Sequence, residues 1–517
     1  MTSPHQPGAA APPPGCPAHA APQQQPHPQE HEPQSPSPSQ QWQQQQQWQQ
    51  QQQWAAAPQQ SMEHQQSMGH PYQQQPMTGH PQAAPPEAQP LVKLYGPEFA
   101  ADPHRIYAQL RQYGALAPVE IAPDVTAMLV TDYRAALDLL HDDSTWSKDS
   151  REWMATVPED SPVMPMLGWR PNVFFNDGPA HDRYRDVIVD SFKLVEPHEL
   201  RARVHHAADS LIQRFGARGE AELIGEYARL LPLLMFNNLF GMPDSYSERL
   251  VAALAGMLEG NSPEEAAAAN EAYTNYIMEL VGSKKAERGA DLTSWYMDHP
   301  NGLSDEEVVH QIILTMGAGN EPLANLIGNA LSRMLSDDRY YNTLSGGALT
   351  AQDAINEVLW NDPPLTNYSA HYPVRDVFFH GTWVRRGQLV MVSYAACNSQ
   401  YDTGSPAATG SGGGSHLAWA AGPHACPVQR HALLIATTAI ERLTAWLSDI
   451  ELAVDASELR WRNGAFHRAL TSLPARFTPI TPDQAGATPW HNRDSSSPTS
   501  STRSEPTSTE RQPASAH

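Results

Sequence analysis

The chain has 517 residues, and its 33 lysines and arginines against 56 aspartates and glutamates give a formal net charge of −23. This acidic balance argues against nucleic acid and against an anionic membrane surface as general partners. The three cysteines, Cys16, Cys397 and Cys426, are too few and too far apart for a disulfide framework. They fit a reducing cytoplasm, where we expect the protein to act. No apolar run reaches the ~18 residues of a membrane span, and we expect no signal peptide.

The two ends of the chain differ in composition from its middle. Residues 1–88 are rich in Gln, Pro and His, with glutamine runs punctuated by Trp42, Trp48 and Trp54, and residues 485–517 are rich in Ser, Thr and Pro. Such compositions bury too little apolar surface to offset chain entropy. We therefore predict two disordered tails around a single large domain at residues 89–484.

Helical patterns dominate the predicted domain. Asp102-Pro103 is typical of a helix start, Ala127–Thr131 predicts a short strand, and Tyr133–Leu140 returns to a helical period. Residues 150–175 contain four prolines and no sustained period, so we expect a long loop of the kind that often covers a binding site. Helical patterns then prevail until strand signals return in residues 381–394. This order predicts a mainly α fold with small β-sheets.

A helix that starts at Asp177-Gly178-Pro179 carries His181 and Arg185 one turn apart on one face. At this spacing both side chains can reach the same anion. For either residue alone, an ordinary position on the surface or in the core is the simpler interpretation.

A long central helix is predicted from Asp305 to about Leu335. Ser304 can cap its first turn, and Glu307, three residues further on, completes the pattern of a capping box. The acidic residues at this end also suit the helix dipole. At 1.5 Å per residue the helix would be roughly 45 Å long, enough to cross the whole domain.

The middle of this helix contains two glycines and a proline. Pro322 lacks an N–H group and its ring clashes with the carbonyl four residues earlier, so we expect a bend or bulge there. Gly317 and Gly319 leave room for a flat group to approach the backbone. A bend that serves packing alone is the alternative interpretation.

Cys426 follows a short loop containing Gly422 and precedes a helical pattern that runs to about Leu443. A cysteine at this position faces first-turn N–H groups and the positive end of the helix dipole, and both favour the thiolate. A thiolate presented in this way is a good iron ligand and one of the axial ligands used by haem proteins. A buried structural cysteine is the alternative.

Two segments resemble signatures of the cytochrome P450 superfamily. Trp419, Gly422, His424 and Cys426 match the aromatic-x-x-Gly-x-His/Arg-x-Cys pattern of its haem-binding loop. The central helix is similar to its distal helix, Ala/Gly-Gly-x-Asp/Glu-Thr; the matching residues are Ala318, Gly319 and Glu321. The resemblance covers most of residues 90–480.

The resemblance implies the cytochrome P450 fold and a haem b whose iron is bound by the Cys426 thiolate. It places Ala318 and Gly319 on the distal side and Trp419 beside the sulfur, where its indole N–H could raise the iron's potential. Contacts to the two haem carboxylates are expected from four side chains, two of them on one helix: His181, Arg185, His371 and His424. Histidine makes a weaker and more pH-sensitive contact than the arginine usual at position 371.

Pro322 departs from the family pattern, which usually has threonine there. The hydroxyl of that threonine, with its acidic neighbour, helps to deliver protons to the oxygen that is being activated. Without it, proton delivery would depend on Glu321, on Asn320, on ordered water or on the substrate itself.

A second departure lies on the predicted helix before Pro363-Pro364, where the family's Glu-x-x-Arg is replaced by Glu357 and Trp360. No lysine or arginine occurs from Gly387 to Gln429, so the family's other cationic partner is also missing. Because an unpaired buried carboxylate is costly, we expect Glu357 to use the Trp360 indole, a histidine such as His416, or backbone donors. The chain resembles a subgroup of actinobacterial members, often encoded beside conservon-type G-protein modules.

The resemblance implies a monooxygenase that inserts oxygen into a small apolar substrate. Its electrons would come from a ferredoxin and a ferredoxin reductase, because no flavin or nicotinamide fingerprint is evident in the sequence. Pro322 and Trp360 leave open a haem-binding sensor or an interaction partner of signalling proteins, with residues 1–88 as a docking arm. A scaffold in which Cys426 binds nothing is the third interpretation.

Overall fold

A computed structural model describes residues 91–480, apart from residues 159, 244–245, 248, 251–252, 254–262, 341–348 and 402–414. The two predicted tails, residues 1–88 and 485–517, lie outside the described residues, as does Cys16. The domain boundaries therefore stay a prediction.

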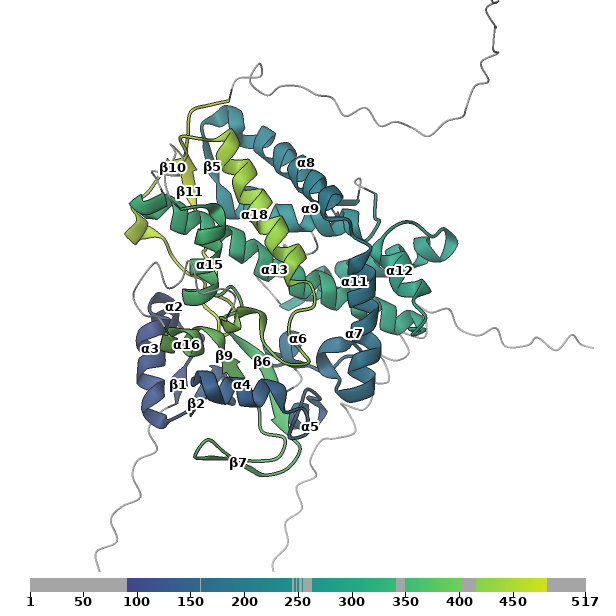
Figure 1. Ribbon diagram of the computed structural model, residues 1–517, viewed down its shortest axis with the longest axis vertical. Coiled ribbons are helices and arrows are strands. Elements are labelled where there is room, and N and C mark those ends of the chain that lie inside the picture. Colours follow the sequence, from purple (N-terminus) through teal and green to yellow (C-terminus); the bar gives the residue numbers. More distant parts are fainter. Residues whose placement is uncertain are drawn as a thin grey trace, which may run out of the picture. The chain divides into compact units, whose positions relative to one another are not determined.

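Helices make up most of the described chain (Figure 1). In chain order the α-helices are α2 (Pro97–Ala101), α3 (Pro103–Leu110), α4 (Tyr133–His141), α5 (Arg151–Met154), α6 (Met164–Leu167), α7 (Gly178–Lys193), α8 (Pro197–Phe215), α9 (Leu230–Leu239), α11 (Pro263–Ala286), α12 (Leu292–Asp298), α13 (Asp305–Ser336), α15 (Ala351–Asn361), α16 (Tyr394–Asn398) and α18 (Gln429–Trp446). Short 3-10 or π turns lie at Arg111–Tyr113, Val173–Phe175, Gly216–Arg218, Ile224–Ala228, Ser399–Tyr401, Leu417–Trp419 and Ala456–Glu458.

The strands in the described part of the chain form three small sheets. Their bounds are β1 (Val92–Lys93), β2 (Leu116–Ala122), β3 (Val125–Val130), β4 (Trp146–Ser147), β5 (Glu220–Glu222), β6 (Asn367–Pro373), β7 (Val377–Phe379), β8 (Thr382–Val384), β9 (Val390–Ser393), β10 (Glu451–Leu452) and β11 (Pro474–Arg476). The largest sheet has the order β1-β2-β3-β9-β6-β4, the second has the order β10-β11-β5, and β7 and β8 form a hairpin. The expectation of a mainly α fold with small β-sheets is confirmed.

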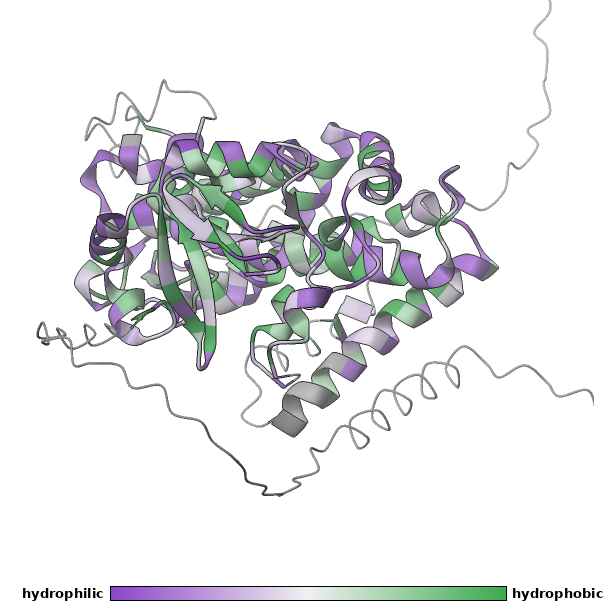
Figure 2. Cartoon of the chain, turned by 90° about the horizontal axis from the view of Figure 1, so that it is seen from below, coloured by the Kyte–Doolittle hydropathy of each residue, from purple (hydrophilic) through white to green (hydrophobic). Residues whose placement is uncertain are grey.

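The largest apolar core forms around α13. This helix packs against α9, α11, α15 and α18, and α18 packs in turn along α8 (Figure 1). The outer helices alternate between hydrophilic and hydrophobic stretches (Figure 2), as expected when one face of a helix is buried. Among the described residues, no helix combines the length and the apolar character needed to cross a membrane.

The predicted ends of α13 agree with the structure. The Ser304 hydroxyl accepts a hydrogen bond from the Glu307 N–H at 3.2 Å, and the Glu307 carboxylate accepts one from the Ser304 N–H at 2.7 Å. The helix continues through Pro322 to Ser336 as one element. The expected bend at Pro322 stays a prediction.

The prediction of an uninterrupted loop at residues 150–175 is wrong in detail. The segment contains the short helices α5 and α6 and a 3-10 turn at Val173–Phe175. These elements are only one turn long, too short to produce a helical period in the sequence.

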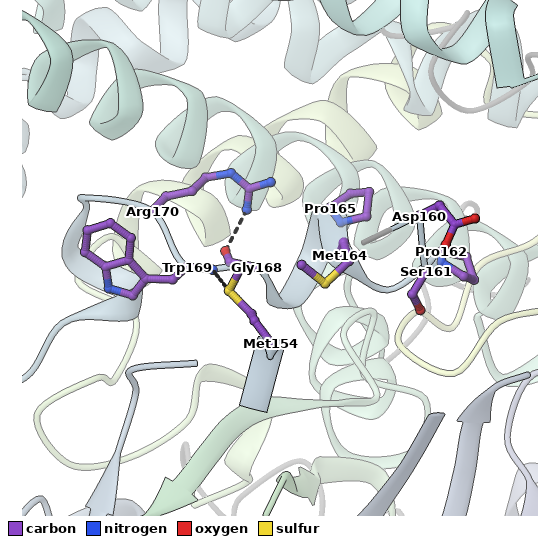
Figure 3. A pocket seen from close by; sticks show the side chains of 9 residues that line it. All are labelled: Met154, Asp160, Ser161, Pro162, Met164, Pro165, Gly168, Trp169 and Arg170. Carbon is purple, nitrogen blue, oxygen red and sulfur yellow. Dashed lines mark hydrogen bonds between the residues drawn. The ribbon is translucent and has the colours of Figure 1, made fainter. Parts of the chain in front are cut away.

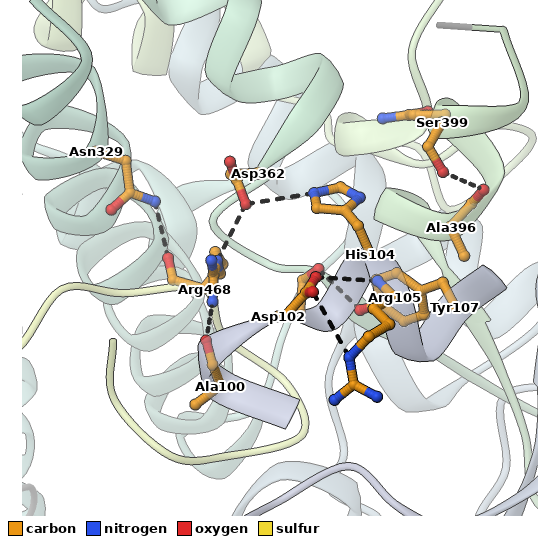
Figure 4. Close-up of polar contacts among 12 residues, drawn as sticks. Ala100, Asp102, His104, Arg105, Tyr107, Asn329, Asp362, Ala396, Ser399 and Arg468 are labelled. Carbon is orange, nitrogen blue, oxygen red and sulfur yellow. Dashed lines mark hydrogen bonds and ion pairs between the residues drawn. The ribbon is translucent and has the colours of Figure 1, made fainter. Parts of the chain in front are cut away.

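Arg468 connects the C-terminal part of the described chain to three earlier segments (Figure 4). Its guanidinium donates to the Asp362 carboxylate at 3.0 Å and to the carbonyl of Ala100, and lies 3.6 Å from the centre of the Trp461 ring. Its own carbonyl accepts a hydrogen bond from Asn329 of α13 at 2.9 Å. This one buried side chain therefore joins α2, the end of α15 and the C-terminal segment.

Candidate functional site

The Cys426 loop is held between a 3-10 turn and the start of α18. The Cys426 N–H donates to the carbonyl of Trp419 at 2.9 Å, and the Ala425 N–H donates to the carbonyl of Gly422 at 3.1 Å. Gly422 has a φ of +69°, and a Cβ there would lie 2.0 Å from the carbonyl oxygen of Leu140. Only glycine allows the loop to approach the end of α4 so closely.

Burial raises the pKa of the Cys426 thiol, although the Val428 N–H and the Arg185 guanidinium act in the opposite direction. The predicted contribution of a first-turn N–H group is present, but without a metal ion the loss of solvation outweighs it. Coordination to a metal ion deprotonates such a thiol outright. The other described cysteine, Cys397, is fully buried in an apolar cluster, and its thiol donates to the carbonyl of Val130 at 3.7 Å.

The structure brings three of the four expected carboxylate-binding side chains next to this loop. The rings of His181 and His424 lie 4.2 Å apart between their centres. Arg185 donates to the carbonyl of Ala425 at 2.8 Å, and His424 Nε2 lies 3.5 Å from Asp177 Oδ1. His181 is buried, and its Nε2 has no hydrogen-bond partner among the described residues.

His371, the fourth expected side chain, lies on β6. Its Nδ1 is 2.6 Å from the carbonyl oxygen of Ser369. Burial lowers the pKa of His371 well below its usual value, and the charges of Lys148 and His424 lower it further. His371 is therefore neutral at pH 7 and lies within electrostatic reach of the other residues of the cluster.

Lys148 is a member of this cluster that we did not predict from the sequence. It follows β4, has 1% of its surface exposed, and its ammonium group donates to the carbonyl of Ala370 at 2.8 Å. A single lysine has no spacing or periodicity to mark it. Only the pairing of β4 with β6 places it beside His371.

On the central helix α13, the glycines are used differently from what we expected. A Cβ at Gly319 would lie 2.4 Å from the Phe236 ring of α9, so Phe236 fills the space that we assigned to a flat group. A Cβ at Gly317 would meet nothing within 4 Å, and both Gly317 and Ala318 are exposed although they lie in the middle of α13. The open stretch of the helix is therefore Gly317-Ala318.

Glu321 does not point freely toward that open stretch. Its carboxylate forms an ion pair with Arg462 and accepts a hydrogen bond from Asn325 at 3.3 Å. Burial raises the pKa of Glu321, but the charges of Arg462 and His467 outweigh it, so that the pKa is lowered overall. The neighbouring Asn320 is buried, and its Oδ1 has no hydrogen-bond partner among the described residues.

The expected partners of Glu357 are wrong. Its carboxylate lies 3.2 Å from Arg333 Nε and 3.0 Å from Arg339 Nη2, so two arginines neutralise it. Arg333 belongs to α13 and Arg339 follows it, so both cations lie outside the Glu357 helix and outside the segment before the cysteine loop, where we expected its partners. Trp360 instead packs edge-on against His416, with ring centres 5.7 Å apart.

A surface pocket of ≈ 490 Å³ lies in the segment that we expected to be a binding loop (Figure 3). Its lining combines methionines with polar side chains: Met154, Asp160, Ser161, Pro162, Met164, Pro165, Gly168, Trp169 and Arg170. The Trp169 N–H lies 3.1 Å from the sulfur of Met154, and Arg170 donates to the carbonyl of Gly168 at 3.0 Å. None of the lining residues belongs to α13 or to the Cys426 loop.

The chain is similar to bacterial proteins over most of their length. It is 28% identical over 405 residues to cytochrome P450 107B1 of Saccharopolyspora erythraea, covering 75% of this chain and 98% of that protein. It is 27% identical over 397 residues to cytochrome P450 monooxygenase PikC of Streptomyces venezuelae, covering 74% and 92% of the two chains. No protein-family model matches the chain.

Solved structures agree with these relatives. CYP154A1 from Streptomyces coelicolor superimposes with a TM-score of 0.66 at 26% identity, covering 75% of this chain and all of the other. CYP154C4 from a Streptomyces species superimposes with a TM-score of 0.67 at 25% identity, covering 75% and 98% of the two chains.

Proposed function

The chain belongs to the cytochrome P450 superfamily, and on this premise we propose that Cys426 supplies the thiolate ligand of a haem b in a monooxygenase acting on a small apolar substrate. The observation that carries the proposal is the position of this sulfur, on a glycine-dependent loop beside Arg185, His181 and His424. Cys397, enclosed in apolar side chains, offers no comparable surroundings.

The described residues fit a flat, dicarboxylate cofactor. Two nitrogens near the Cys426 loop, His181 Nε2 and Trp419 Nε1, are buried without a hydrogen-bond partner among the described residues. Buried polar groups are normally hydrogen-bonded, so these atoms point to a missing partner. On the other side, the exposed Gly317-Ala318 backbone leaves the middle of α13 open to a flat group. When bound, haem supplies the activation of oxygen and its insertion into a C–H bond.

The protein's own part in this reaction is to hold the substrate and to deliver protons. Asn320 is the candidate for contact with the reacting groups, because its buried Oδ1 is without a partner in the described part of the chain. Glu321 is held by Arg462 and would act only after it leaves that ion pair. Pro322 contributes neither a hydroxyl nor an N–H group.

Electrons would come from a ferredoxin and its reductase, since the sequence carries no flavin or nicotinamide fingerprint. The alternative, a haem-binding sensor or signalling partner with little turnover, keeps the same fold and cofactor. The relatives named above include monooxygenases, which does not favour that alternative. Membership of the conservon-associated subgroup stays a prediction.

The absorption spectrum of the reduced protein under carbon monoxide tests the proposal. We expect a strongly red-shifted Soret band that is lost in Cys426→Ala and kept in the matched control Cys397→Ala. A band of the same position in Cys426→Ala would overturn the assignment of the ligand. A histidine-type band in the unmodified protein would contradict thiolate ligation altogether.

A further inference from the structure

Lys148 is a buried cation for which the described residues provide no ion-pair partner. Its ammonium group donates to the Ala370 carbonyl at 2.8 Å and to the Ser369 hydroxyl at 3.3 Å, and it lies 4.6 Å from the centre of the Phe174 ring. All three of these groups are neutral. Removing an ammonium ion from water costs several kcal/mol, and neutral acceptors offset only part of that cost.

Asp177, the carboxylate whose charge acts on Lys148, makes its hydrogen bonds to groups other than the Lys148 ammonium. Its Oδ2 accepts hydrogen bonds from the Ser147 hydroxyl at 2.6 Å and from the backbone N–H of Lys148 at 2.8 Å. Its Oδ1 lies 3.5 Å from His424. Burial lowers the pKa of the Lys148 ammonium to about 7, while the charge of Asp177 acts in the opposite direction. The charged form of Lys148 in this position would be stabilised by a further anion.

Apart from Asp177, the described titratable side chains that interact electrostatically with Lys148 are histidines. Lys148 influences both His371 and His424 electrostatically, and the His424 ring lies 4.2 Å from the His181 ring between centres, with the two planes tilted by 51°. Arg185 approaches the same loop from α7. Two carboxylates lie at this cluster, Asp177 at His424 and the mostly exposed Asp182 at His181, but within the described residues neither forms an ion pair with the Lys148 ammonium, so that buried charge is unmatched without a bound anion.

His371 cannot supply the missing contact itself. Its Nδ1 faces the carbonyl of Ser369, so in the neutral ring the proton is held on Nδ1 and Nε2 is an acceptor. An acceptor nitrogen cannot donate to a carboxylate. The positive donor on the β6 side of the cluster is therefore Lys148.

Building on the proposed function, we propose that Lys148 binds one of the two haem carboxylates from the β6 side, while Arg185 serves the other side of the same cluster from α7. Lys148 is then a cofactor-binding residue, and the buried ammonium is matched by the cofactor's own charge. His371 stays neutral beside it, held by the Ser369 carbonyl.

The test compares two ligands in the full-length apo-protein: hemin, and hemin dimethyl ester, in which both carboxylates are blocked. Lys148→Gln removes the charge and keeps an N–H for the Ala370 carbonyl, and Lys193→Gln, at an exposed lysine of α7, is the control. Binding is measured by quenching of tryptophan fluorescence and by the Soret band. We expect Lys148→Gln to weaken hemin binding by ~10–100-fold, the range of a charge-assisted hydrogen bond, and to leave the ester unchanged.

Two outcomes would overturn the role of Lys148: an equal loss for hemin and its ester, which indicates a structural effect, or no loss for either. Lys148→Arg keeps the charge, and its preference for hemin over the ester should survive even where Lys148→Gln folds poorly; loss of that preference also contradicts the proposal. The carbon monoxide spectrum of the unmodified protein separates the two claims. A thiolate-type band with unchanged hemin affinity in Lys148→Gln would remove this inference and leave the proposed function intact.

Discussion

Arg462 and Glu321 form an ion pair, although 141 positions separate them in the chain. The pair fixes the Glu321 carboxylate, next to Pro322, against the C-terminal segment. In this position the carboxylate does not lie freely over the open stretch Gly317-Ala318 of α13. Both partners are largely shielded from solvent, so the pair is less screened than a surface salt bridge. The ion pair therefore fixes the position of Glu321, the one acidic side chain in the middle of the central helix α13.

Breaking this pair from the arginine side should destabilise the protein. Arg462→Gln leaves Glu321 buried without its cation, and we expect the free energy of unfolding to fall by ~2–3 kcal/mol in urea titrations. The double variant Glu321→Gln/Arg462→Gln should recover part of that loss, because no unpaired charge remains. Arg460→Gln, which contacts only nearby carbonyls, serves as the control. Strictly additive losses in the double variant would show that the two side chains are not coupled.

Restoring threonine at position 322 should separate helix stability from proton delivery. Pro322→Ala and Pro322→Thr both restore an N–H group in α13, and each should raise the free energy of unfolding by ~1 kcal/mol, part of the cost of an interior proline. Only Pro322→Thr adds a hydroxyl. We therefore expect it alone to raise the fraction of consumed oxygen that appears in product.

The measurement for Pro322 pairs thermal unfolding with oxygen and product assays on any substrate that is turned over. A gain in coupling of the same size in Pro322→Ala would remove the hydroxyl from the explanation. No gain in either variant would favour the haem-binding sensor.

Each of the two arginines at Glu357 should partly compensate for loss of the other in stabilising the buried carboxylate. Glu357→Ala removes both contacts and should lower the free energy of unfolding by ~2 kcal/mol, a value reduced because Arg333 and Arg339 are each more than one-third exposed. Arg333→Ala or Arg339→Ala alone should cost less than half as much, since one cation remains. Chemical denaturation of the three single variants and of the double arginine variant measures this. A single arginine variant as unstable as Glu357→Ala would contradict the shared role.

Asp362 should make stability depend on pH in the acid range. Burial acts to raise its pKa, but His104 and Arg468 lower it to about 2 (Figure 4). Because the folded pKa is below the unfolded value near 4, the stabilisation is complete above about pH 4 and is lost as the pH falls from about 4 to about 2. We expect ~2 kcal/mol to be lost over that interval, measured by urea unfolding at stepwise pH.

The matched variants for this pH dependence are Asp362→Asn, which should lose this part of the acid slope, and Asp376→Asn, an exposed carboxylate that should keep it. An unchanged slope in Asp362→Asn would mean that other carboxylates account for the acid sensitivity.

The sequence predicted those parts of the fold that depend on near neighbours in the chain. The capping box of α13 and the start of α3 involve residues three positions apart, and both agree with the structure. The strand β2 escaped notice because it contains Pro118, a residue that ordinarily argues against a strand between two others. The position of Cys426 before a helix was also visible in the sequence, since loop and helix adjoin.

The parts of the site that could not be predicted depend on contacts between distant segments. Nothing near Glu357 in sequence indicates Arg333 or Arg339, and nothing near Gly319 indicates that the ring of Phe236 occupies its surface. Lys148 becomes part of the cluster only because β4 pairs with β6, more than two hundred positions later. The roles of the cofactor-binding residues themselves stay predictions until they are tested.

The hydrogen bond from Arg468 to the carbonyl of Ala100 joins residues 368 positions apart, and this has a consequence for how the protein is made. At ~5–20 residues per second on the ribosome, roughly 20–70 s pass between the synthesis of α2 and that of its partner. Throughout that interval the N-terminal helices lack the residue that fastens them to α13 and α15. The domain can therefore complete its fold, and with it any cofactor pocket, only late in translation or after release from the ribosome.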